Sequence, residues 1–248
     1  MSILNVIRSI IFNIVFYCFA LIWIPGLGIF CFVANEKWAR KGVAGFCNGS
    51  KIIARIFMGI RYEYRGLDKL PSEGAIIMLS KHQSNFDPIL AFKGRRDLTA
   101  LAKKELFFPF MRTIFRKMSV IKVDRQSRKA HEAMPEAGKK VAESNLALVV
   151  YPEATRVPVG EKRKLKSGAY YLQKDLDIPV YPISTNAGVF WGKGFWHKSG
   201  TAIYQVGDPF PTGLTKEAFM KLANEKIIKE SEALMIEGGV SPETFKNS

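Results

Sequence analysis

Histidine and cysteine are scarce in this chain of 248 residues, which contains three of each. The cysteines (Cys18, Cys31 and Cys47) lie in the N-terminal fifth, and their spacing matches neither a zinc site nor a redox pair. We therefore interpret them as small apolar side chains, without disulfides, in a protein of a reducing compartment. The chain also lacks a G-x-S-x-G sequence, the nucleophile elbow of serine hydrolases. Neither a serine nor a cysteine is thus expected to act as a nucleophile.

Acidic residues are also few: 22 Asp and Glu stand against 37 Lys and Arg, which gives a formal net charge of +15. Such an excess predicts an anionic partner, either nucleic acid, an anionic bilayer or a phosphorylated substrate. The chain contains no recognisable nucleic-acid-binding motif, and nucleic-acid binding would not explain its apolar N-terminal segment. We therefore expect an anionic membrane and a phospholipid as partners, and no nucleic acid.

Charged side chains are absent from residues 9–35. As one straight helix this run would span about 40 Å, which exceeds a hydrocarbon core of about 30 Å. Pro25 interrupts it, so it could form one kinked spanning helix or two shorter helices that enter and leave the same leaflet. Only Arg8 precedes the run, whereas many basic residues follow it. This pattern predicts the inner (plasma) membrane, with the rest of the chain on its cytoplasmic face.

Residues 36–62 have the pattern of a basic amphipathic helix. Apolar residues recur there at three- and four-residue steps, and lysines and arginines fall on the opposite face. Such a helix can lie in a membrane interface with its cations towards anionic headgroups. Gly42, Gly45, Gly49 and Ser50 lower its helix propensity and favour a break in this region.

Beyond residue 59, short apolar runs alternate with helical patterns. Strands are predicted at residues 60–65, 75–79, 99–102, 120–123, 146–150, 178–183 and 201–206. Helices are predicted at residues 88–92, 107–117, 126–145, 169–174 and 216–236, with a new start or a kink at Pro135. The alternation predicts an α/β fold: a mixed sheet flanked by helices and preceded by an N-terminal hydrophobic and amphipathic membrane anchor.

His82 is the histidine best placed for chemistry, because it directly follows the buried-strand pattern AIIMLSK. Ligands of open α/β sheets bind at the carboxyl ends of the strands. Asp87 could accept a hydrogen bond from one imidazole nitrogen, fix the tautomer and raise the basicity of the other nitrogen. The alternative is that Asp87 only caps a helix that starts at Pro88. We interpret His131 as solvated and His197 as a loop residue.

Polar side chains also follow the predicted strand at residues 146–150. Arg156 offers a planar fork of donors to a phosphate, and Glu153 can accept a hydrogen bond from a hydroxyl, although the two could equally form a surface ion pair. Arg125 and Lys104 follow other strands. Since the chain has no evident nucleophile, we expect a substrate hydroxyl to attack a thioester, with His82 as its base.

Four blocks within about residues 60–210 resemble the glycerolipid acyltransferases. HQSNFD (82–87) resembles the H-x4-D block of that family, and VIKVDR (120–125) resembles its second block. YPEATR (151–156) is similar to its F-P-E-G-T-R block, and IPVYPI (178–183) to its fourth, proline-containing block. AKKEL (102–106) also looks familial.

The resemblance implies roles for particular residues. His82 would be the general base and Asp87 its orienting partner. Contacts with the acceptor would come from Arg125 in the second block, from Glu153, Ala154, Thr155 and Arg156 in the third, and from Lys104 near the phosphate or the developing oxyanion. Ala154 stands where the family has glycine, and it would incur a steric cost if the position requires a positive φ.

The implied reaction needs neither metal nor cofactor. An acyl group would pass from acyl-CoA or acyl carrier protein to the sn-2 hydroxyl of lysophosphatidic acid, giving phosphatidic acid for phospholipid synthesis. We accordingly divide the chain into membrane-anchoring helices (1–58) and a catalytic domain (59–248). The alternatives are an acyltransferase for another lysophospholipid or a lyso-aminolipid, and a non-catalytic membrane-binding protein.

Overall fold

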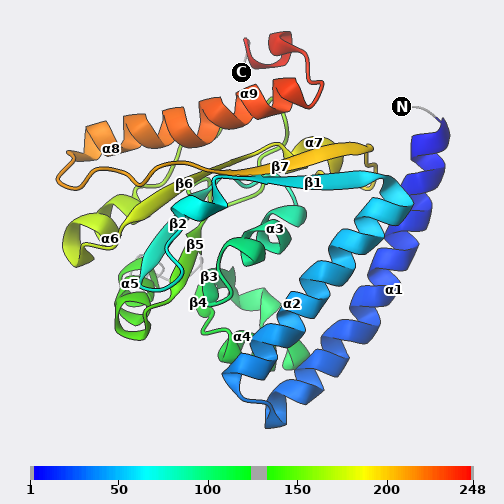
Figure 1. The fold of residues 1–248 in the computed structure, drawn as a ribbon, viewed down its shortest axis with the longest axis horizontal. Coiled ribbons are helices and arrows are strands. Elements are labelled where there is room, and N and C mark those ends of the chain that lie inside the picture. The colour runs from blue at the N-terminus through cyan, green and yellow to red at the C-terminus, as the bar shows by residue number, and fades with distance from the viewer. Residues whose placement is uncertain (1–2, 124–132, 247–248) are drawn as a thin grey trace.

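The computed structural model describes residues 3–123 and 133–246, which form a seven-stranded sheet with helices on both faces (Figure 1). The strands are β1 (Ile60–Arg65), β2 (Ile76–Ser80), β3 (Leu98–Lys103), β4 (Ile121–Val123), β5 (Ala147–Val150), β6 (Val180–Thr185) and β7 (Gly200–Val206). Their order is β1-β7-β6-β2-β5-β3-β4. β2 pairs in parallel with β5 and β6, whereas β6 and β7 are antiparallel. The predicted mixed α/β sheet is confirmed.

Apart from the short α7, which was not predicted, the helices also lie close to the predicted ranges. They are α1 (Ile3–Val33), α2 (Glu36–Ile53), α3 (Phe86–Gly94), α4 (Pro109–Lys117), α5 (Ala133–Ser144), α6 (Gly168–Leu176), α7 (Ala187–Phe190), α8 (Lys216–Ala223) and α9 (Glu230–Glu237). The helix predicted at residues 126–145 falls partly on residues that the structure does not describe. A π-helical turn, Asn224–Lys229, joins α8 to α9 within the single helix predicted there.

Alternating side chains of the central strands fill two hydrophobic cores. Ile76 and Met78 of β2 belong to a core shared with α1, α2, α3 and α4, while Ile77 and Leu79 face a second core under α5, α6 and α8. Every residue of β2 is buried. Because apolar residues are needed on both faces, such a strand is continuously apolar in sequence, and its polar residues begin where it ends.

The N-terminal segment forms a helical hairpin. α1 is one helix of 31 residues that passes through Pro25, and α2 begins after Asn35, whose side chain accepts a hydrogen bond from the Trp38 N–H at 3.1 Å. α2 is continuous, so the predicted break at its glycines is wrong. The reason is packing: a Cβ on Gly42 would lie 2.3 Å from Leu27 of α1, and a Cβ on Gly45 or Gly49 would lie 2.8 Å from Trp23 or 2.6 Å from Phe19 of the same helix.

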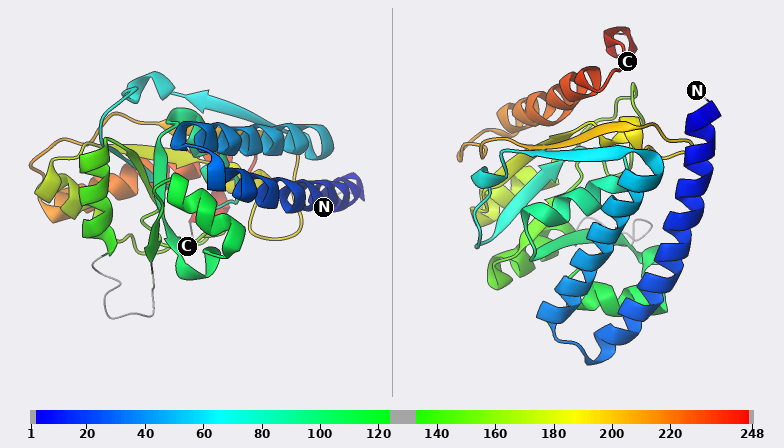
Figure 2. Two further views of the ribbon diagram at one scale, coloured as in Figure 1. Left: turned by 90° about the horizontal axis from the view of Figure 1, so that it is seen from below. Right: turned by 45° about the vertical axis from the view of Figure 1, so that its right-hand side comes forward.

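The hairpin is packed onto the body rather than separate from it. Phe12 and Phe16 of α1 and Cys47 of α2 belong to the same hydrophobic core as β2. Most of α1 nevertheless stays exposed, because only 11% of its most apolar stretch is buried. By length and composition α1 could cross a membrane. Figure 2 (right) shows it along the outer edge of the molecule.

Candidate active site

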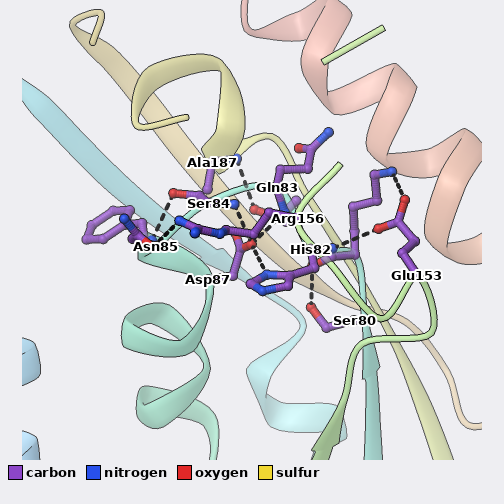
Figure 3. A network of polar contacts seen from close by, with 12 residues as sticks. Ser80, His82, Gln83, Ser84, Asn85, Asp87, Glu153, Arg156 and Ala187 are labelled. Atoms are coloured by element: carbon purple, nitrogen blue, oxygen red, sulfur yellow. Dashed lines mark hydrogen bonds and ion pairs between the residues drawn. The ribbon is translucent and has the colours of Figure 1, made fainter. Parts of the chain in front are cut away.

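The turn after β2 brings His82 and Asp87 together (Figure 3). α3 begins at Phe86, so Asp87 lies in its first turn. The Asp87 Oδ2 atom accepts hydrogen bonds from the backbone N–H groups of Gln83 (2.7 Å) and Ser84 (2.8 Å) and lies 2.9 Å from His82 Nδ1. The interpretation that Asp87 only caps the helix is wrong, because its carboxylate bonds the preceding turn and the imidazole.

This geometry determines which imidazole nitrogen donates to Asp87. A carboxylate can only accept, so Nδ1 carries a proton, and in the neutral imidazole the lone pair is then on Nε2. The Asp87 side chain is fully buried, whereas that of His82 is 19% exposed. Among the described residues, Nε2 has no hydrogen-bond partner. The imidazole is therefore held through Nδ1, and its other nitrogen is left for a further partner.

Tyr151, which the sequence did not single out for the site, packs against the imidazole. Its ring stacks on that of His82 with 4.0 Å between centroids and 19° between planes. Burial, together with the nearby Asp87 carboxylate, raises the pKa of its hydroxyl well above the ordinary value. The aromatic ring thus fixes the plane of the imidazole from the side of β5.

Glu153 occupies a different environment from the one expected. It is fully buried, and its Oε1 atom forms an ion pair with the ammonium of Lys81, which is also buried. Its Oε2 atom accepts the backbone N–H of His82 at 3.1 Å. Glu153 therefore fastens the segment after β5 to the His82 turn, and its carboxylate is engaged with the protein rather than directed to an acceptor hydroxyl.

The rest of the YPEATR block closes over the same turn. Ala154 has a φ of +57°, so this position does require the left-handed conformation that favours glycine. Its N–H donates to the Tyr151 carbonyl at 2.9 Å, within the block itself. Thr155 is half-buried beside it, and Arg156 Nη1 donates to the Asn85 side chain of the His82 turn. The guanidinium therefore lies next to His82 and Asp87, the dyad of this site (Figure 3).

Lys104 lies farther along the same edge of the sheet. With Phe107, Arg112 and Lys122 it lines a hollow of about 300 Å³ beyond the end of β3. Arg112 and Lys122 were not predicted, since they come from α4 and β4 and meet Lys104 only in the fold. Arg125 and His131 lie outside the described residues, so the structure does not place them.

His197 contacts α1 rather than His82 or Asp87. It lies in a loop as predicted, but it is buried, with Nε2 3.3 Å from the Asn13 Oδ1 of α1. Burial lowers the pKa of His197 to about 4, which keeps the ring neutral.

Residues 61–186 match the sequence model of the family described as Acyltransferase. The chain is also 31% identical over 213 residues to the 1-acyl-sn-glycerol-3-phosphate acyltransferase of Pseudomonas aeruginosa, covering 84% of this chain and 82% of that protein. The chain belongs to the acyltransferase family. The Haemophilus influenzae enzyme of the same name is 25% identical to this acyltransferase over 219 residues, covering 85% and 88% of the two chains.

The fold of this acyltransferase is also that of a solved structure. The crystal structure of the 1-acyl-sn-glycerophosphate acyltransferase PlsC from Thermotoga maritima matches it with a TM-score of 0.76 and 22% identity, over 93% of this chain and 97% of that one. The family match spans the dyad, Lys104 and the YPEATR block. Within the described ranges of the acyltransferase, no three His, Cys, Asp or Glu side chains gather into a group that could hold a metal ion.

Proposed function

We propose that this acyltransferase moves a fatty acyl group from an acyl thioester to the sn-2 hydroxyl of lysophosphatidic acid, forming phosphatidic acid. The observation that carries the proposal is the contact of 2.9 Å between His82 Nδ1 and buried Asp87, which leaves Nε2 of the partly exposed His82 side chain without a partner among the described residues. The names of the relatives support the choice of acceptor. The donor is acyl-CoA or acyl carrier protein, and no cofactor takes part.

The proposed reaction proceeds in two proton transfers. His82 Nε2 takes the proton of the acceptor hydroxyl as its oxygen attacks the thioester carbonyl carbon. Asp87 stabilises the imidazolium that forms, and Tyr151 holds the ring in plane. When the tetrahedral intermediate collapses, the carbon–sulfur bond breaks and the imidazolium returns the proton to the leaving thiolate. No acyl-enzyme forms in this scheme.

The acceptor phosphate is assigned to cations at the same edge of the sheet. Arg156 reaches the His82 turn, and Lys104, Arg112 and Lys122 surround a hollow beyond β3. Guanidinium forks suit phosphate oxygens, and clustered ammonium groups attract them over longer distances. Arg125 is retained as a further phosphate contact because of the family resemblance of its block.

We also propose that the protein works on the cytoplasmic face of an anionic inner (plasma) membrane. The outer face of α1 exposes large apolar side chains along its length, including Ile14, Leu21 and Ile22. A net charge of +15 favours a surface of anionic lipids. A membrane-bound enzyme would meet its lysophospholipid acceptor directly in the interface.

A panel of acceptors and donors tests this function. Purified protein in detergent would be given radiolabelled lysophosphatidic acid, other lysophospholipids or a lyso-aminolipid, each with acyl-CoA and with acyl carrier protein thioesters. We expect the highest rate with lysophosphatidic acid. A higher rate with a different acceptor would reassign the substrate, and no transfer with any pair would refute the proposal. Arg156→Ala should mainly raise the KM for the acceptor, whereas Lys69→Ala, remote from the site, should not.

A further inference from the structure

Two loops of the catalytic body hold α1 near its two ends. Towards the N-terminal end, the loop of residues 191–199 between α7 and β7 bonds polar side chains of the helix. The Asn13 Nδ2 atom donates to the Phe195 carbonyl at 2.9 Å, and the His197 N–H donates to the Ser9 hydroxyl at 2.9 Å. The Ser9 bond is buried and the Asn13 bond is partly buried, and both join an apolar helix to the loop, so they fix the position of the helix against it.

The second set of contacts lies towards the C-terminal end of α1. The segment of residues 104–110, which runs from the end of β3 into the first turn of α4, passes Gly28, where an added Cβ would lie 2.6 Å from that of Phe110. The Thr113 hydroxyl donates to the Gly28 carbonyl at 2.9 Å. Asn13 and Gly28 are separated by roughly 23 Å along the helix axis. α1 is thus docked along its length rather than held at one point.

Both holding segments expose large apolar side chains beside cations. In the 191–199 loop, Phe195 is 50% and Trp196 51% exposed, between exposed Lys193 and Lys198. In the 104–110 segment, Leu106 and Phe108 are each 47% exposed, and exposed Lys103, Arg112 and Arg116 lie nearby in sequence. Aromatic rings next to lysines and arginines are typical of the boundary between headgroups and acyl chains.

We propose that the 191–199 loop and the 104–110 segment are two additional interfacial anchors that insert Phe195, Trp196, Leu106 and Phe108 into an anionic bilayer. The inference rests on the proposed membrane association. A bilayer is favoured over a protein partner because both anchors adjoin the exposed apolar face of α1 and combine apolar side chains with positive charge. The cations complement anionic headgroups, as a surface for a second basic copy would not.

The anchors would also set the position of the active site relative to the interface. The Ser84 hydroxyl of the His82 turn donates to the carbonyl of Trp191, the first residue of the 191–199 loop. The 104–110 segment begins with Lys104, which lines the basic hollow. Each anchor is therefore directly joined to one part of the site, which keeps the site at a constant height above the lipid surface.

Fluorescence and vesicle binding test the anchors in the full chain. Vesicles of phosphatidylcholine with anionic phosphatidylglycerol, made with or without brominated acyl chains, would quench any tryptophan that reaches the acyl chains. The Trp196→Phe variant should lose part of the quenching seen in the parent protein. Phe195→Ser with Trp196→Ser, and separately Leu106→Ser with Phe108→Ser, should weaken flotation with vesicles by roughly tenfold. Tyr171→Ser, an exposed aromatic on α6, should leave it unchanged.

Activity in solution separates this inference from the proposed function. With a short-chain, monomeric lysophosphatidic acid and no vesicles, the serine variants should turn over at the parent rate, because the anchors do not contact the reacting atoms. Unchanged flotation, or equal quenching of the parent protein and Trp196→Phe, would overturn the anchors. If the parent protein shows no quenching but forms a dimer, and the serine variants do not form that dimer, the surface would be assigned to a second copy instead. If the serine variants misfold, quenching alone decides: Trp196→Phe tests the 191–199 loop, and adding Phe108→Trp to the Trp196→Phe protein, which should restore quenching, tests the 104–110 segment.

Discussion

Lys81 and Glu153 form an ion pair inside the protein, with side chains 3% and 0% exposed. Glu153→Gln would leave the Lys81 ammonium buried without its counter-charge, and Lys81→Met would leave the Glu153 carboxylate in the same state. Breaking a buried pair from one side typically costs about 3–5 kcal/mol. Each single variant should therefore lose about that much free energy of unfolding.

The double variant distinguishes an ion pair from two independent contacts. Lys81→Met combined with Glu153→Gln removes both charges, and the amide oxygen that replaces the carboxylate at position 153 could still accept the His82 N–H. We expect the double variant to recover most of the lost stability, to within about 1–2 kcal/mol of the parent protein. Lys69→Met serves as the control, because the Lys69–Asp208 pair is exposed and its loss should cost less than about 1 kcal/mol.

Urea titration in detergent micelles, followed by near-ultraviolet circular dichroism, would measure these free energies. The same proteins would be assayed at low temperature for the KM of the acceptor. A structural role for Glu153 predicts lower stability with an unchanged KM in the folded fraction. If Glu153→Gln raised the KM while its free energy of unfolding stayed that of the parent protein, the reasoning from burial would be refuted and a direct contact with the acceptor supported.

Three further variants test single features of the structure. The pKa of His197 is about 4 in the folded protein against an ordinary 6.5, so between these pH values the residue binds a proton only in the unfolded chain. The free energy of unfolding should therefore fall by up to about 3 kcal/mol as the pH drops from 6.5 to 4. If the free energy of unfolding of His197→Asn depended on pH as steeply as that of the parent protein, this reasoning would be contradicted. Ala154→Gly should raise the free energy of unfolding by about 1 kcal/mol in urea titrations, whereas Ala137→Gly in α5 should lower it. Tyr151→Phe should retain the turnover of the parent protein while Tyr151→Leu loses roughly tenfold or more in kcat, and equal rates for the two would argue against stacking on His82.

The sequence predicted the features that are local in the chain. β2 and β5 are buried on both faces, so their apolar runs were evident without any partner. His82 and Asp87 lie in one turn, five positions apart, and their pairing depends on little beyond that turn. A positive φ at Ala154 was considered from the sequence, because glycine stands at this position in the family and alanine would incur a steric cost there.

The features that the sequence did not predict depend on distant contacts. Lys81 and Glu153 are 72 positions apart, and the apparent candidate for acceptor binding turned out to be half of a buried pair. The sequence left open whether the apolar segment forms one kinked helix or two shorter ones, and the structure has a single helix through Pro25, with Trp23 and Leu27 on either side packed against Gly45 and Gly42 of α2. Propensity within either segment could not reveal this.

The turnover number of His82→Ala tests the central claim most directly. It would be measured with lysophosphatidic acid and an acyl thioester at saturating concentrations, beside His131→Ala as a control. If His82 removes the hydroxyl proton, its loss should lower kcat by about 10²- to 10⁴-fold while the free energy of unfolding changes little and the control keeps its rate. A folded His82→Ala protein with turnover near that of the parent would contradict the account.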